Sequence, residues 1–277
     1  MLFGIKLMCG EVKKYSIPLS FFQSEIDPNK IIIRMPLTPF PYLTFNIYPK
    51  KDISTFFSFV QDAEYDEGRN LEWAVFKNHP KLRKYFEKTK FIGKQSDISE
   101  YVERIYSQDE KLMYGWKDYC ETVWSGNRER YYEVVHSIFD ASFWPDGKYI
   151  AYPTIWGMYP RFLEDKTFQL PYTEEKRDKL LFVIAHEMLH FIFYEYFFSK
   201  YPEYREGDHD FFLWNVSEIF NTIVQGSITF PSDMNDSEAA YPEHEKIVSE
   251  LRNTYIKISR ENVNECIETI VKLISEK

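Results

Sequence analysis

Twenty residues of the C-terminal half, Leu180–Ser199, read LLFVIAHEMLHFIFYEYFFS and decide how this 277-residue chain folds. The stretch contains no Lys, Arg or Asp. A segment of this length that is apolar on nearly every side predicts a helix buried in the core. We expect the helix to begin near Thr173, whose side chain can cap it, and to end near Lys200.

The motif HExxH lies inside this expected helix, as His186-Glu187-Met188-Leu189-His190. Residues four apart differ by about 40° around a helix axis, so both imidazoles point to one side and can bind one metal ion. Glu187 lies next to them, where it can reach a metal-bound water without being a ligand. Burying three polar groups in so apolar a helix is unfavourable unless a partner such as a metal satisfies them.

This combination predicts hydrolysis with a bound zinc ion, Zn2+. Zinc lowers the pKa of its water toward neutrality, and Glu187 can take that proton and pass it to the leaving group. At these residues the sequence resembles the zincin metallopeptidases, over about residues 173–225. The resemblance implies an α+β domain in which a small twisted sheet packs on the active-site helix and a mostly helical half follows. The alternative is a catalytically silent zincin-like module that binds metal or peptide.

A third protein ligand is needed, and zincin variants differ in where it comes from. The metzincin extension needs a Gly at position 193 and a His at position 196, but this chain has Phe193 and Tyr196. The gluzincin, or thermolysin-like, arrangement takes a Glu from a second helix downstream, and Glu218 in the expected helix Phe211–Val224 is the candidate. An isolated carboxylate in so apolar a helix has to be neutralised, paired or metal-bound.

Other third ligands remain open because the thermolysin-type N-E-x-x-S-D signature is absent. The rivals lie in the loop between the two helices: His209 would complete a three-His site, and Asp208 or Asp210 would resemble the aspzincin choice. Asn221 lies beside Glu218 on the helix and is a candidate partner for a ligand. Glu195 falls on the opposite side of its helix from His186 and is a poor ligand.

The resemblance also implies a substrate-binding strand and an electrophilic helper. Zincins usually carry a short edge strand above the HExxH helix, which aligns an extended peptide substrate, and Lys148–Ile155 or Thr167–Leu170 is the candidate. His209, Tyr241 or His244 is the candidate for stabilising the negative charge that develops on the substrate carbonyl.

The N-terminal residues 1–110 form a mixed α/β region of unassigned role, and 111–277 form the zincin-like domain. Strands are expected at Lys30–Met35 and Tyr42–Tyr48, a helix capped by Asp52, and another helix over Asn70–Lys88. The polar stretch Phe91–Asp109 is the best boundary. Two amphipathic helices, Pro242–Ile258 and Asn262–Ser275, end the chain.

Composition excludes several classes of protein. The chain has 34 Lys+Arg against 43 Asp+Glu, a formal charge of −9, and no dominant basic cluster, so we expect no nucleic-acid partner. The two apolar runs approach a membrane-spanning length but are rich in Phe and Tyr and interrupted by polar groups, so we expect no membrane partner either. Three distant cysteines without a CxxC, and no targeting segment, predict a cytoplasmic protein. A peptide or protein is the expected substrate.

Overall fold

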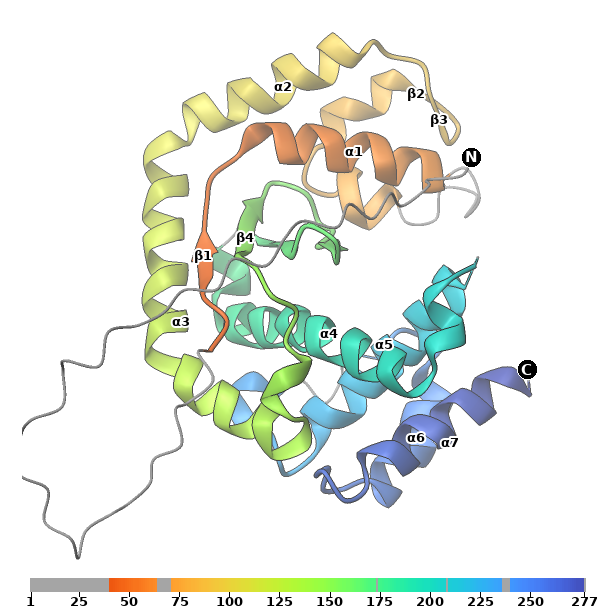
Figure 1. The fold of residues 1–277 in the computed structure, drawn as a ribbon. Helices are drawn as coiled ribbons and strands as arrows, with labels where there is room; N and C mark the ends of the chain where they lie inside the picture. The colour runs from red at the N-terminus through yellow and green to blue at the C-terminus, as the bar shows by residue number, and fades with distance from the viewer. Residues whose placement is uncertain (1–39, 64–70, 173, 208, 236–239, 277) are drawn as a thin grey trace, which may run out of the picture. The chain divides into compact units, whose positions relative to one another are not determined.

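The computed structural model describes residues 40–63, 71–172, 174–207, 209–235 and 240–276, all within one compact unit, Thr38–Lys277 (Figure 1). Three of our predictions lie outside the described residues: the strand Lys30–Met35, the cap Thr173 and the candidate ligand Asp208. The fold is α+β, as predicted, with a small sheet and several long helices.

The main sheet has four strands in the order β1-β4-β6-β5. The first three are parallel, and β5 runs antiparallel to β6 at one edge. The strands expected within Tyr42–Tyr48, Lys148–Ile155 and Thr167–Leu170 are confirmed. They come from both sides of residue 110, and a domain boundary there stays a prediction. The strands are β1 (Leu43–Phe45), β4 (Tyr149–Thr154), β5 (Arg161–Phe162) and β6 (Thr167–Pro171).

The helix that carries HExxH, α4, lies at the centre of the larger hydrophobic core. It packs on the sheet through Phe191, whose ring centroid lies 5.2 Å from that of Tyr149 in β4. Because nearly every face of α4 is apolar, the sheet, α3 and α5 together bury it. The helices of this half are α3 (Glu110–Ile138), α4 (Leu180–Lys200), α5 (Asp210–Gly226), α6 (Glu245–Thr254) and α7 (Val263–Ser275).

A second core lies among the N-terminal elements, where Phe56 packs between the rings of Phe86, Phe91 and Trp156. The predicted helix over Asn70–Lys88 is wrong, because Pro80 cannot continue a helix, and two short helical turns and a strand replace it. The elements are α1 (Pro49–Ala63), a π-helical turn (Glu72–Phe76), a 3₁₀ helix (Pro80–Tyr85), the hairpin β2 (Phe86–Glu87) and β3 (Lys90–Phe91), and α2 (Gln95–Gln108).

Asp52 lies inside α1 and does not cap it. Its buried carboxylate accepts hydrogen bonds from the Tyr106 hydroxyl (2.8 Å), the Ile155 backbone N–H (3.1 Å) and the Gln169 side-chain amide (2.6 Å). These three donors belong to α2, to the end of β4 and to β6. Asp52 therefore connects α1 to α2 and to the sheet through buried hydrogen bonds, and we call this group of contacts the Asp52 joint.

Candidate metal centre

Helices α4 and α5 bring His186, His190 and Glu218 together. The two imidazole Nε2 atoms lie 3.1 Å apart, and those of His186 and His190 lie 3.1 Å and 3.5 Å from the Glu218 carboxylate oxygens Oε2 and Oε1, respectively. His190 and Glu218 are buried, and His186 is half-buried at the wall of a cleft. Among the described residues, this is the group whose donor atoms could share one metal ion.

One ligand atom from each of the three residues lies within 4.8 Å of the other two. Zinc with bonds of about 2.0–2.1 Å to nitrogen and oxygen places neighbouring ligand atoms about 3.3 Å apart. His186 Nε2 is close to that spacing, at 3.1 Å from both His190 Nε2 and Glu218 Oε2, whereas the 3.5 Å distance from His190 Nε2 is to the other carboxylate oxygen, Oε1. Two imidazoles and one carboxylate also form a donor set that zinc uses in catalytic sites, where a fourth position stays open for water.

Gln225, one residue before the end of α5, fixes the orientation of the His186 ring. The His186 Nδ1 lies 2.7 Å from Gln225 Oε1, and the Gln225 amide nitrogen donates to the backbone carbonyls of Phe182 (3.3 Å) and Met234 (3.0 Å). Because these carbonyls take the amide donors, the Gln225 oxygen is left to accept from His186 Nδ1–H. The Nε2 nitrogen therefore faces the other two candidate ligands.

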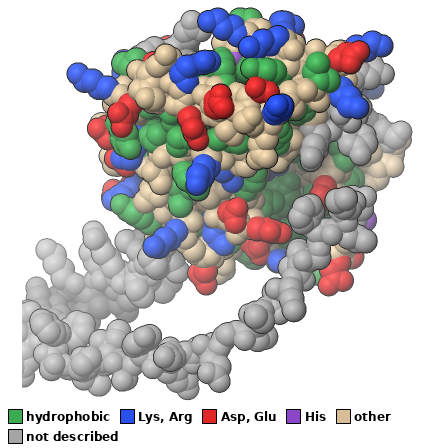
Figure 2. Space-filling view, turned by 90° about the horizontal axis from the view of Figure 1, so that it is seen from above, with side chains coloured by type: hydrophobic (Ala, Val, Ile, Leu, Met, Phe, Trp, Pro, Cys, Tyr) green, Lys and Arg blue, Asp and Glu red, His purple; other side chains and the backbone are tan. Residues whose placement is uncertain are grey.

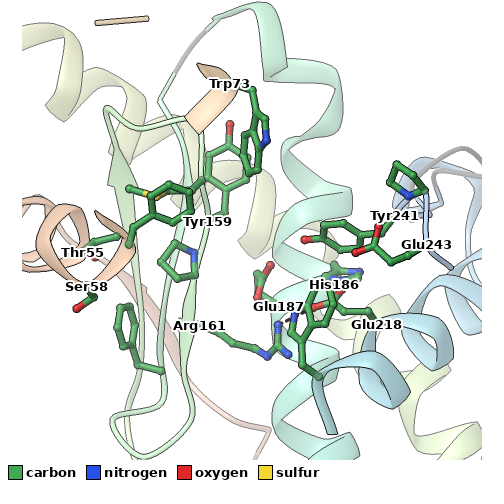
Figure 3. A pocket seen from close by; sticks show the side chains of 16 residues that line it. Thr55, Ser58, Trp73, Tyr159, Arg161, His186, Glu187, Glu218, Tyr241 and Glu243 are labelled. Atoms are coloured by element: carbon green, nitrogen blue, oxygen red, sulfur yellow. Dashed lines mark hydrogen bonds and ion pairs between the residues drawn. The ribbon is translucent and has the colours of Figure 1, made fainter. Parts of the chain in front are cut away.

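Arg161 of the edge strand β5 holds the Glu218 carboxylate from the other side (Figure 3). Its guanidinium Nη1 donates to Glu218 Oε1 at 2.8 Å, and Nη2 lies within 3.3 Å of the Tyr194 and Ser217 hydroxyls. The side chains of this ion pair are only 13% and 4% exposed. Sequence reasoning missed Arg161, because nothing near it in the sequence marks a site.

The electrostatics of the cluster favour the metal-binding forms of Glu218 and His190, but the protonated form of His186. Burial alone raises the pKa of Glu218, but the charge of Arg161 and the hydrogen bond with His186 outweigh burial and hold this pKa well below its usual range, so the carboxylate is ionised. Burial, and then the positive charge of Arg161, hold the pKa of His190 well below its usual value, so its imidazole is neutral. For His186, burial lowers the pKa, but the hydrogen bond and charge of Glu218 outweigh burial and raise it.

Glu187 lies beside the cluster with its carboxyl group directed into the cleft (Figure 3). Its Oε2 is buried and has no hydrogen-bond partner among the described residues. Burial is the main reason that the pKa of Glu187 is raised to about 7. A carboxyl group that titrates near neutrality, held beside a candidate metal site, is suited to accept and return a proton.

The cleft has a volume of about 990 Å³, and two walls from distant parts of the sequence enclose it. One wall comes from α1, the π-helical turn and residues 158–162, and the other from α4, α5 and residues 241–243. Gly157 lets the first wall close: a Cβ there would lie 2.4 Å from the Trp73 carbonyl oxygen. The labelled residues of Figure 3 show both walls: Thr55, Ser58, Trp73 and Tyr159 face His186, Tyr241 and Glu243.

The strand at the cleft is β5, and neither predicted candidate for a substrate-binding strand is at an edge. Lys148–Ile155 contains β4 and Thr167–Leu170 lies in β6, and both strands have a neighbour on each side in the sheet. With two residues, Arg161–Phe162, β5 is too short to show an alternating pattern in the sequence.

The rival ligands that the structure describes lie apart from the cluster. His209 precedes α5, where its ring packs 5.1 Å from that of Tyr204, and Asp210 is exposed in the first turn of the helix. Glu195 pairs with Arg205 at the surface (2.9 Å), as its place on the helix predicts. Asn221 donates to the His186 backbone carbonyl at 3.4 Å and so contacts the α4 backbone and not a ligand side chain.

Of the three helper candidates, Tyr241 lines the cleft. Burial, and then the charges of Glu218 and Glu187, raise the pKa of its phenol, so the hydroxyl stays protonated. His244 is buried, with Nε2 2.7 Å from Asn215 Oδ1, and neither His244 nor His209 lines the cleft.

No family model, curated protein or solved structure matches the chain. The resemblance to the zincins therefore stays a prediction. One described helix, Arg177–Lys200, is long and apolar enough to cross a membrane, but 78% of its most apolar window is buried inside the protein.

Proposed function

We propose that this chain is a zinc-dependent metallopeptidase of the zincin type, in which His186, His190 and Glu218 hold one zinc ion. The observation that supports the proposal is the convergence of two imidazoles and an ionised carboxylate, with ligand atoms within 4.8 Å of one another, in the wall of a large cleft. A bound zinc ion would act as a Lewis acid on the substrate carbonyl and make a coordinated water a stronger acid.

Glu187 is the proposed general base and general acid. With a pKa of about 7, its carboxylate accepts a proton from the attacking water near neutral pH. The same group then passes that proton to the leaving amine, because its carboxyl group is directed into the cleft beside the cluster. Its position next to His186 on α4 keeps it near the cluster without making it a ligand.

The proposed substrate is an extended peptide that lies in the cleft along β5. An edge strand has backbone N–H and C=O groups free on one side, and these can pair with a peptide backbone. From the opposite wall, the protonated Tyr241 hydroxyl can donate to the carbonyl oxygen on which negative charge develops. The rings of Trp73 and Tyr241 line the cleft and give it apolar surface for substrate side chains.

Cleavage of a diverse peptide library, followed by mass spectrometry, tests the proposal. We expect zinc-loaded wild type to cut peptides, and we expect Glu187→Gln to bind zinc equally well while cutting none. A chelator should abolish the wild-type activity, and added zinc should restore it. If the zinc-loaded wild type cuts nothing, the peptidase proposal is wrong and the catalytically silent module takes its place.

A further inference from the structure

Contrary to our expectation of no dominant basic cluster, one strongly basic segment interrupts this otherwise acidic chain. Residues Lys77–Lys94, KNHPKLRKYFEKTKFIGK, contain seven Lys or Arg and a single acidic residue, which gives a formal charge of +6. The remainder of the chain then carries −15. We call the exposed face of this segment the basic surface.

The charges of the basic surface are exposed and largely uncompensated. All seven cationic side chains are exposed. Arg83 pairs with Glu72 (2.6 Å) outside the segment, and none of the other six forms an ion pair with an acidic side chain that the structure describes. Six like charges on one short segment repel one another, so a negatively charged partner that neutralises them is stabilising.

A polar hollow of about 670 Å³ lies in this surface. Its cationic lining residues are Lys81, Lys84 and Arg104. Asp97 and Glu100 also line it, but Asp97 already accepts a hydrogen bond from the Lys94 backbone N–H at 2.7 Å. Asn78, Tyr85 and Gln108 add neutral polar groups. The hollow therefore offers several donors to carboxylates at one place.

The basic surface and the cleft share one structural support, α1. Phe56 of α1 packs on the hairpin, with ring centroids 6.2 Å from Phe86 and 5.7 Å from Phe91. Thr55 and Ser58 of the same helix line the cleft. The basic segment and one wall of the cleft are therefore built against the same helix.

We propose that the basic surface is an exosite that binds an acidic segment of the peptide or protein substrate while the neighbouring segment enters the cleft. This inference rests on the proposed peptidase function. Figure 2, which views the molecule from the side of α1 and α2, shows several Lys and Arg side chains along the upper edge of this face, and basic and acidic side chains interspersed over the rest of it. A short acidic segment can contact the basic surface without approaching the rest of the protein, which is acidic. A membrane or a long nucleic acid also approaches that acidic surface and is repelled by it.

Binding of a fluorescently labelled Glu-rich peptide to the Glu187→Gln protein tests the exosite without cleavage. The test variant is Lys77→Glu/Lys81→Glu/Lys84→Glu, and the control is Lys111→Glu/Lys148→Glu/Lys257→Glu, which reverses three exposed lysines elsewhere. We expect the test variant to bind at least about tenfold more weakly, and the control to stay within about twofold of the parent. Equal loss in both variants, or no binding by the parent, would overturn the exosite.

Two further measurements separate the partner classes and the two proposals. Vesicles rich in phosphatidylserine or a single-stranded oligonucleotide should bind more weakly than the peptide, and tighter binding of either would overturn the acidic-peptide assignment. With cleavable peptides, the test variant should raise KM about tenfold for an acid-tagged substrate and leave its untagged counterpart unchanged. If the Glu-rich peptide binds but no peptide is ever cut, the basic surface is still a binding site for acidic peptides, and the peptidase proposal fails. If both substrates are cut with unchanged KM, the exosite fails and the peptidase proposal stands.

Discussion

Two buried carboxylates, Glu218 and Asp52, show how the same chemical group serves different ends in one chain. Glu218 faces two imidazoles and the Arg161 guanidinium, and its pKa is held well below the usual range. Asp52 faces neutral donors, namely a phenol, a backbone N–H and an amide, and burial raises its pKa to about 6. The comparison teaches that convergent basic groups distinguish a candidate metal ligand from a structural hydrogen-bonding group, although both are buried.

The largest effect should come from Glu187→Gln. Removing the proposed proton carrier while keeping the shape of the side chain should lower kcat by about 10²–10⁴, with zinc content unchanged. Asp52→Asn, the matched change at the structural joint, should leave kcat of the folded protein within about threefold. Equal losses of kcat in the two folded variants would remove the distinction between the two regions.

Arg161→Met should destabilise the metal-free protein by about 3–5 kcal/mol, because it leaves the Glu218 charge buried without its cationic partner. Urea unfolding in the presence of a chelator measures this change. Arg205→Met breaks the exposed pair with Glu195 and should cost about 0–1 kcal/mol. If the two variants lose the same stability, Arg161 does not compensate Glu218 in the way the contacts indicate.

The Asp52 joint should make stability depend on pH. Its pKa is about 6 in the folded protein and 3.8 in its ordinary state, so the folded chain binds more protons between these values. Stability contributed by the protonated carboxyl is therefore present below about pH 4 and is lost as the pH rises through about 6. Urea unfolding of wild type and Asp52→Asn across this range should show a steeper fall for wild type. Parallel profiles would contradict the raised pKa.

The smallest effect should come from Gln225→Leu, which removes the acceptor of the His186 Nδ1 hydrogen. We expect zinc affinity to fall about 10–100-fold, measured by competition with a chelator. Gln225→Glu keeps an acceptor at the same place and should retain most of the affinity. If both variants bind zinc like wild type, Gln225 does not orient the ligand.

The predictable part of this protein is the part that helical geometry determines. The spacing of His186 and His190 was enough to predict that both imidazoles lie on one side of α4. The resemblance to the gluzincins and the cost of burying a lone carboxylate made Glu218 the candidate third ligand, while His209, Asp208 and Asp210 stayed open until the contacts between the helices were known.

The remainder depends on contacts between segments that are distant in the sequence. Arg161 joins the site only because β5 folds back antiparallel on β6, and a two-residue strand leaves no periodic pattern. The wall formed by α1 lies even farther from HExxH in the sequence. Asp52 was expected at a helix end because Asp is a preferred capping residue. It lies inside α1 instead, where its carboxylate accepts hydrogen bonds from three donors of other elements.

Anomalous scattering at the zinc edge, from crystals of the purified protein, tests the central claim most directly. The account predicts one strong peak within bonding distance of His186 Nε2, His190 Nε2 and a Glu218 carboxylate oxygen, and no peak in Glu218→Gln crystals grown under the same conditions. A wild-type crystal soaked in zinc that shows no peak between these three side chains would contradict the account.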